Sequence, residues 1–146
     1  MIDFKGKRVL VTGGQGFLGR NLVPLLEKCN CTLSVVSHKE YDLEDQGEVW
    51  RMLVLNKPDI VIHLAGVCGG VKTCMANPGS FFYQNSIMGL HMIEQCRKEN
   101  IKKLVMIGSI CVYPKKALPP FNEDDIWEGY PEESNAPYGI AKRMIS

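Results

Sequence analysis

The chain has 146 residues, of which 45% are hydrophobic and 23% are charged, so one packed domain over residues 1–146 is expected. Seventeen basic and 16 acidic residues give a formal net charge of +1, which offers no electrostatic basis for binding nucleic acid or an anionic membrane. No apolar run approaches the roughly 20 residues that span a bilayer, and no signal-peptide pattern opens the chain, so a cytoplasmic protein is expected.

Short apolar runs alternate with segments of helical periodicity along the first 108 residues. The pattern predicts strands over residues 7–12, 32–37, 59–65 and 103–108, and helices over residues 17–28, 45–56 and 78–99. Unbroken apolar strands that alternate with helices are typical of a parallel sheet covered on both faces. The expected fold is therefore α/β, with a doubly wound, mostly parallel, Rossmann-like sheet.

The segment from Cys111 to Pro137 breaks this pattern. It contains five prolines and the acidic run Glu123-Asp124-Asp125, which together predict a long irregular loop. Pro137 suits the first turn of a final helix.

Six cysteines are scattered along the chain. Cys29 and Cys31 are two residues apart, with no second pair and no nearby His to complete a zinc set. Reduced thiols and no metal site are therefore expected.

Three glycines, Gly13, Gly16 and Gly19, directly follow the first predicted strand and open the first helix. In a dinucleotide-binding turn, the first permits a tight turn, the second lets the backbone approach a pyrophosphate, and the third permits close packing of the helix on the strand. With Phe17 and Leu18, they form the predicted phosphate site. The spacing differs from G-x-G-x-x-G, and a strand–helix turn without a ligand is the alternative.

The second strand is followed by polar residues that bear on the choice of nucleotide. An acid at this point would bind the ribose 2′-hydroxyl of NAD, but the chain has Ser37 and Lys39 here and no acid before Glu40. Ser and Lys can bind a 2′-phosphate, so NADP is favoured over NAD. Asp42, next to Leu43, is a candidate contact for the adenine. An ordinary solvated loop is the alternative.

The third strand ends in His63-Leu64-Ala65-Gly66, whose small residues would let the backbone lie against the cofactor. We expect His63 to be a packed or hydrogen-bonded strand residue, because it precedes the end of the strand.

Tyr138 and Lys142 are four residues apart, which places them on one face of a helix. An ammonium beside the phenol is expected to lower the pKa of Tyr138. Ser109 follows the fourth strand, where it could donate to the same substrate oxygen as Tyr138, and Cys111 could line that pocket or be a buried inert thiol. The combination indicates a nicotinamide-dependent enzyme that acts on a carbonyl or an alcohol.

These motifs resemble the extended short-chain dehydrogenases/reductases, the NAD-dependent epimerase/dehydratase family, and within it the GDP-L-fucose synthase group. The general match lies in Thr12–Gly19, His63–Gly66, Asn85, Ser109, Tyr138 and Lys142. The more specific match lies in Val67–Gly70, Phe82–Asn85, Gly108–Pro114 and Asn135–Lys142.

The resemblance implies that Ser109, Tyr138 and Lys142 form a reductase triad and that Cys111 is an acid/base in two epimerisations. It further implies that NADPH reduces the 4-keto group of a GDP-sugar and that the protein is a homodimer. Candidate substrate contacts are Gly69, Gly70 and Asn85.

Members of the resembling family are longer and carry a second acid/base, a His, in a C-terminal part that also binds most of the substrate. His91, inside a predicted helix, is not a plausible substitute. The expectation is a chain truncated before the substrate-binding part, which binds the cofactor and shows little turnover. The alternatives are another nucleotide-sugar epimerase or dehydratase, a nonenzymatic nucleotide-binding module, and an unstable fragment.

Overall fold

The computed structural model describes residues 3–146, and the chain divides into two compact units. Unit 1 comprises the chain up to Gly66 together with Leu90–Ile107, and unit 2 comprises Val67–Gly89 and Gly108–Ser146.

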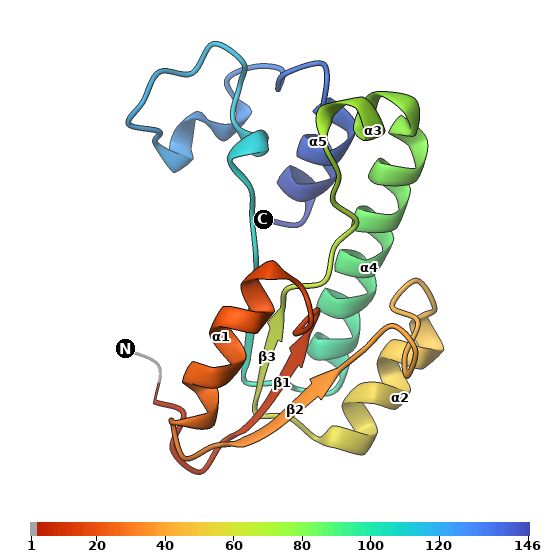
Figure 1. Ribbon diagram of the computed structural model, residues 1–146, viewed down its shortest axis with the longest axis vertical. Coiled ribbons are helices and arrows are strands. Elements are labelled where there is room, and N and C mark those ends of the chain that lie inside the picture. Colours follow the sequence, from red (N-terminus) through yellow and green to blue (C-terminus); the bar gives the residue numbers. More distant parts are fainter. Residues whose placement is uncertain (1–2) are drawn as a thin grey trace. The chain divides into compact units, whose positions relative to one another are not determined.

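A four-stranded parallel sheet forms the centre of unit 1 (Figure 1). Its strands are β1 (Arg8–Thr12), β2 (Thr32–Val36), β3 (Ile60–His63) and β4 (Lys103–Met106), in the order β2-β1-β3-β4. The chain leaves β1 toward one edge of the sheet and then returns past it to build the other edge, so the order reverses between β1 and β3. The expected doubly wound parallel sheet is confirmed, and such a reversal point is where sheets of this kind bind ligands.

One face of the sheet packs against α1 (Phe17–Glu27). Val9 and Val11 of β1 and Ile60 and Ile62 of β3 are buried together with Leu26 of this helix. The four strand residues alternate along their strands, as residues on one face of a sheet must. Burial of each such side chain stabilises the fold by about 1.5–3 kcal/mol.

The opposite face carries the intervening strand residues, Leu10 and Val61, which are fully buried. Figure 1 shows α1 on one side of the strands and α2 (Gln46–Asn56) on the other. The helix α4 (Pro78–Lys98) runs from unit 2 into unit 1, where its residue Met92 is fully buried.

The beginning of α2 shows how the sequence sets a helix boundary. Asp45 caps the helix, and its Oδ1 accepts hydrogen bonds from the backbone N–H groups of Gly47 (2.7 Å) and Glu48 (3.1 Å). These bonds satisfy N–H groups that have no partner within the helix. The helix ends at Lys57, which adopts a left-handed conformation with φ of 44°.

Unit 2 contains α3 (Val71–Ala76), the beginning of α4, two 3-10 turns and a final helix, α5 (Ala136–Met144). The sequence analysis did not predict α3. The expected irregular loop is broken by the 3-10 turns η1 (Ile110–Val112) and η2 (Glu123–Trp127), and Asn122 caps the second of them by accepting from the N–H of Asp124 at 3.2 Å. Pro137 lies in the first turn of α5, as predicted.

Arg143 fixes α5 to the rest of unit 2. Its Nε donates to the carbonyl oxygen of Val112 at 2.9 Å, its Nη2 donates to the same oxygen, and its Nη1 donates to the carbonyl of Gly129 at 3.0 Å. The guanidinium group also lies over the ring of Trp127, 5.3 Å from its centroid. Because Arg143 is buried, these bonds are needed to compensate for the loss of hydration of its charge.

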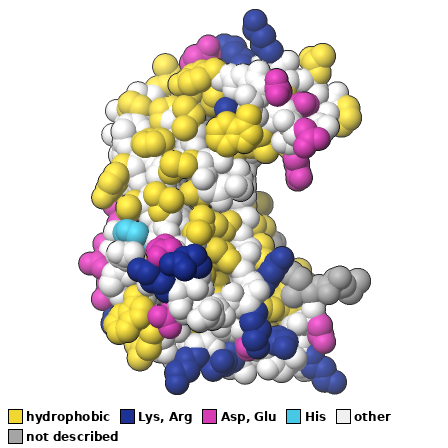
Figure 2. Space-filling model, turned by 180° about the vertical axis from the view of Figure 1, so that it is seen from behind, with side chains coloured by type: hydrophobic (Ala, Val, Ile, Leu, Met, Phe, Trp, Pro, Cys, Tyr) yellow, Lys and Arg dark blue, Asp and Glu magenta, His cyan; other side chains and the backbone are white. Residues whose placement is uncertain are grey.

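Among the described helices, none is both long and apolar enough to cross a membrane. Figure 2 shows Lys and Arg side chains with Asp and Glu side chains among them on the face that it presents.

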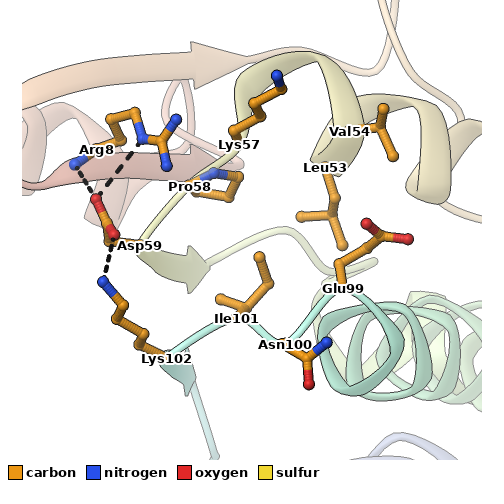
Figure 3. Close-up of a pocket in the computed structure, with 10 residues that line it drawn as sticks. All are labelled: Arg8, Leu53, Val54, Lys57, Pro58, Asp59, Glu99, Asn100, Ile101 and Lys102. Atoms are coloured by element: carbon orange, nitrogen blue, oxygen red, sulfur yellow. Dashed lines mark hydrogen bonds and ion pairs between the residues drawn. The ribbon is translucent and has the colours of Figure 1, made fainter.

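A cavity of about 360 Å³ in unit 1 lies at the amino ends of the strands (Figure 3). At its edge, Asp59 forms ion pairs with Lys102 (3.0 Å) and with Arg8 (3.7 Å), and it also accepts from the backbone N–H of Arg8 at 3.0 Å. These three residues come from the starts of β1, β3 and β4. The hydrogen bonds lower the pKa of Asp59 from its ordinary 3.8 to about 2, chiefly through the N–H of Arg8 and then through Lys102.

We expect Asp59→Asn to lower the free energy of unfolding at neutral pH, because the ionised carboxylate is the favoured form in the folded protein. A lowered pKa stabilises the fold above the ordinary pKa, and the contribution is lost as the pH falls through the folded value. The difference between wild type and variant should therefore shrink as the pH falls from about 4 to about 2. Urea unfolding at a series of pH values measures it.

Glu27→Gln is the matched control, because Glu27 is an exposed carboxylate at the end of α1. A loss of stability in Asp59→Asn that is the same at pH 7 and pH 2 would contradict the lowered pKa of Asp59 in the folded protein.

Candidate active site

Gly13 makes the tight turn after β1. Its φ is +70°, a conformation that favours glycine, and a Cβ atom here would lie 2.6 Å from the backbone nitrogen of Ala65. The turn therefore packs directly on the backbone after β3, at Leu64 and Ala65. The predicted tight turn at Gly13 is confirmed, and the small residues after β3 are what it packs against.

The third predicted glycine has a different role from the one expected. A Cβ atom on Gly19 would lie 2.4 Å from the Cα of Gly14, so α1 packs on the glycine turn at this point rather than on a strand. Gly14, which the sequence analysis passed over, faces β2, where a Cβ would lie 2.3 Å from Cγ1 of Val35. Both positions need glycine for space.

The start of α1 is open to solvent and has no side-chain cap. Gly16 occupies the cap position in an extended conformation, and within residues 3–146 no side-chain cap accepts from the first N–H groups of the helix. Phe17 is 90% exposed, and Leu18 is also exposed. Uncapped N–H groups at a helix start, beside glycines that leave the backbone accessible, fit a phosphate group.

The residues after β2 are arranged differently from the expectation. Both the hydroxyl and the backbone N–H of Ser37 donate to the carboxylate of Glu40. Lys39 is exposed. Asp42 accepts from the N–H of Glu44 at 3.0 Å, and the side chain of Leu43 is buried in the core, so only its backbone remains a candidate contact.

His63 is 2% exposed, and its Nδ1 shares a 2.8 Å hydrogen bond with the hydroxyl of Thr12. The prediction of a packed, hydrogen-bonded strand residue is confirmed.

In unit 2, the hydroxyl of Tyr138 is the centre of a polar cluster. The thiol of Cys68 donates to it at 3.7 Å, and the side chain of Ser109 lies close enough to lower its pKa as a hydrogen-bond partner. Burial raises the pKa of Tyr138 above its ordinary value of 10, and the hydrogen bond with Cys68 raises it further, whereas Ser109 lowers it. The expected net fall in this pKa was therefore wrong, because burial, together with Cys68, outweighs the lowering by Ser109.

Lys142 lies on the same helix as Tyr138, as predicted, with its Nζ 6.0 Å from the centroid of the Tyr138 ring. The side chain is 6% exposed, and burial lowers the pKa of Lys142. Desolvation therefore favours the neutral form of both groups. The helical spacing of four residues carries no information on burial, so it predicted the wrong direction for the pKa shift of Tyr138.

Cys111 and Tyr138 line the same cavity, of about 120 Å³, together with Cys68 and Asn135. The prediction that Cys111 faces the pocket of Tyr138 is thus confirmed, while its chemical role stays a prediction. Asn135 donates from Nδ2 to the sulfur of Cys111 at 3.1 Å. Its Oδ1 is buried and has no hydrogen-bond partner among the described residues, so this oxygen is a candidate acceptor for a donor group of a ligand.

Asn85, whose role as a substrate contact stays a prediction, is hydrogen-bonded within the fold. It is 2% exposed, it accepts from the N–H of Val67 at 3.0 Å, and its amide donates to the carbonyl oxygens of Val67 and Phe81. Both amide hydrogens are thereby used. These bonds hold the segment that precedes Gly69 and Gly70. Gly69 lines the cavity, and Gly70 precedes α3.

Gly139 was missed by the sequence analysis. A Cβ atom at this position would lie 2.3 Å from the carbonyl oxygen of Cys111, so a glycine here lets α5 approach η1. The available signal was a glycine inside a helix, where it costs stability and so needs a packing reason. Cys68 and Asn135 were quoted only as parts of motifs.

Residues 9–146 match the model of the NAD dependent epimerase/dehydratase family. The chain belongs to this family.

Among curated relatives, the chain is 36% identical over 137 residues to a GDP-L-fucose synthase of Sinorhizobium fredii, an alignment that covers 94% of the chain and 44% of the relative. It is 33% identical over 135 residues to a GDP-L-colitose synthase of Yersinia pseudotuberculosis, which covers 92% of the chain and 44% of the relative. The chain thus spans less than half the length of the curated relatives that it matches.

Similar solved structures are also matched over less than half of their length. A GDP-mannoheptose C4 reductase from Campylobacter jejuni with NADP bound matches with a TM-score of 0.89 and 29% identity, over 97% of this chain and 45% of that one. A GDP-L-fucose synthetase from Naegleria fowleri bound to NADP matches with a TM-score of 0.82 and 31% identity, over 97% of this chain and 42% of that one.

We expect Gly13→Ala to destabilise the fold more than Gly6→Ala. Both glycines have nearly the same positive φ, +70° and +68°, but only Gly13 faces backbone atoms, and nothing lies within 4 Å of a Cβ on Gly6. Gly6→Ala should cost the left-handed penalty of about 1–2 kcal/mol, and Gly13→Ala should cost this and the clash with Ala65. Denaturant unfolding measures the loss of stability in each variant. Equal losses would show that the turn does not pack on the segment after β3.

We expect two substitutions to move the pKa of Tyr138 in opposite directions. Cys68→Ala removes a partner that raises the pKa and should lower it, whereas Ser109→Ala removes a partner that lowers the pKa and should raise it. Ultraviolet titration of the phenolate, with Tyr138→Phe as the blank, measures both shifts. Shifts of the same sign in the two variants would rule out this hydrogen-bond arrangement.

Proposed function

We propose that this chain carries the nucleotide-binding and catalytic residues of an NADPH-dependent enzyme that epimerises and reduces a GDP-4-keto-6-deoxy sugar to GDP-L-fucose. The observation that carries the proposal is the hydroxyl of Tyr138, which Ser109 binds while Lys142 lies buried on the same helix. Relatives described as GDP-L-fucose synthases support the substrate class.

We further propose that residues 1–146 are an NADP-binding, Rossmann-like domain. Gly13 and Gly16 and the open start of α1 fit the pyrophosphate, and Ser37 and Lys39 are the candidate partners of the 2′-phosphate. Two of the similar structures are described as bound to NADP. When bound, NADPH supplies the hydride for the reduction.

In the proposed reduction, Tyr138 donates a proton to the 4-keto oxygen of the sugar. Its raised pKa keeps the phenol protonated at neutral pH, which is the state that a proton donor needs. Ser109 would donate a second hydrogen bond to the same oxygen. Lys142 would stabilise the phenolate that remains after the proton has left.

In the proposed epimerisations, the 4-keto group makes the hydrogens on the two flanking carbons acidic. Cys111 would act as one of two acid/base groups, exchanging a proton on one face of the sugar through an enolate, whose oxyanion Tyr138 and Ser109 would stabilise. Inversion also needs a second acid/base on the opposite face, the His that the resembling family carries in its C-terminal part. Asn135 holds the sulfur of Cys111 through its amide, and its unpartnered Oδ1 would accept from a hydroxyl of the sugar.

A second candidate is the reduction of another GDP-sugar without the epimerisations. The relative described as a GDP-mannoheptose C4 reductase favours it, since its structure matches the chain with a TM-score of 0.89, against 0.82 for the GDP-L-fucose synthetase bound to NADP. Turnover of a panel of GDP-keto sugars would separate the two. A homodimer in the cytoplasm is part of the proposal, and sedimentation would test the oligomeric state.

We expect the 146-residue chain to bind NADPH in calorimetry and to oxidise it slowly when a GDP-4-keto-6-deoxy sugar is added. Tyr138→Phe should lower that oxidation by at least about 100-fold with NADPH affinity unchanged, because only proton donation is removed. Lys142→Ala should lower both the rate of NADPH oxidation and the affinity for NADPH. A folded chain that binds no NADPH would refute the proposed cofactor. Binding with steady, rapid turnover would instead refute the expectation of a weakly active chain.

A further inference from the structure

A tight turn follows β2 and is held from two sides. The carbonyl oxygen of Ser37 accepts from the N–H groups of Glu40 and Tyr41, each at 3.1 Å. Arg51, from α2, donates to the carbonyl oxygen of Glu40 at 2.9 Å and lies over the ring of Tyr41, 4.5 Å from its centroid. The backbone of Glu40 is thus fixed by contacts that do not involve its carboxylate.

The carboxylate of Glu40 turns back onto the end of β2. One of its oxygens, Oε2, accepts from the hydroxyl of Ser37 at 2.7 Å and from the N–H of Ser37 at 2.8 Å. These two bonds lower the pKa of Glu40, so the carboxylate is ionised throughout the neutral range. The carboxylate of Glu40 therefore occupies the donors of Ser37, a residue that the proposed function assigns to the 2′-phosphate of the nucleotide.

We infer that Glu40 is a displaceable internal anion that sets the preference between the two nicotinamide dinucleotides, an inference that rests on the proposed cofactor site. A 2′-phosphate must displace the carboxylate from Ser37, because two anions repel each other and compete for the same donors. A ribose 2′-hydroxyl has no such conflict, since it can donate to the carboxylate where it is. Glu40 thus weakens the binding of NADP and leaves that of NAD unaffected or stronger.

Calorimetric titration of the full 146-residue chain with NADP⁺ and with NAD⁺ tests the inference. Glu40→Gln keeps the size of the side chain and removes its charge, so it should strengthen NADP⁺ binding about tenfold, a typical coupling between two interacting groups. NAD⁺ binding should stay the same or weaken. In a Ser37→Ala background, the gain from Glu40→Gln should shrink, because the contested donor is gone.

Glu27→Gln is the matched control, since it removes one exposed carboxylate at the far end of α1 and should change neither affinity. Equal strengthening of both nucleotides, or no change in NADP⁺ binding by Glu40→Gln, would overturn the role of Glu40 and leave the proposed function intact. If the folded wild type and Glu40→Gln bound neither nucleotide, the proposed cofactor and the role of Glu40 would both be refuted.

Discussion

The polar cluster of unit 2 depends on how closely α5 can approach the segment that follows β4. Gly139 allows this approach because a side chain at its position would overlap the carbonyl oxygen of Cys111. Arg143, one turn further along, binds the carbonyl oxygen of Val112 and so fixes the helix to the same segment. With α5 held here, Tyr138 reaches Ser109, and Asn135 reaches Cys111. A backbone contact therefore arranges the side chains that would carry the chemistry.

The fold was largely predictable from local patterns. The observed strands and the helices α1, α2 and α4 end within three residues of the sequence-based bounds, because each strand consists mostly of apolar residues and α2 has a capping residue, Asp45. The helix α3 was missed since six residues give too little periodicity to detect. The 3-10 turns between 111 and 137 depend on local caps such as Asn122 that resemble ordinary turn residues.

The candidate site was predictable in part. The spacing of Tyr138 and Lys142 placed them on one helix, but it could not report burial, and burial decides the pKa of Tyr138. Asn85 carried a family match, yet its amide is used within the fold. The contacts of Gly14 and Glu40 depend on where β2 and its turn lie, which a sequence without a structure does not show.

The approach of α5 at Gly139 holds Tyr138 in its buried, hydrogen-bonded state. The most direct measurement is the pKa of Tyr138 in Gly139→Ala, with circular dichroism as the check that the chain is folded. The added methyl group should move α5 away from Cys111 and expose Tyr138, so that the pKa of Tyr138 falls toward the ordinary value of 10. A folded variant in which Tyr138 titrates as it does in the wild type would contradict the claim.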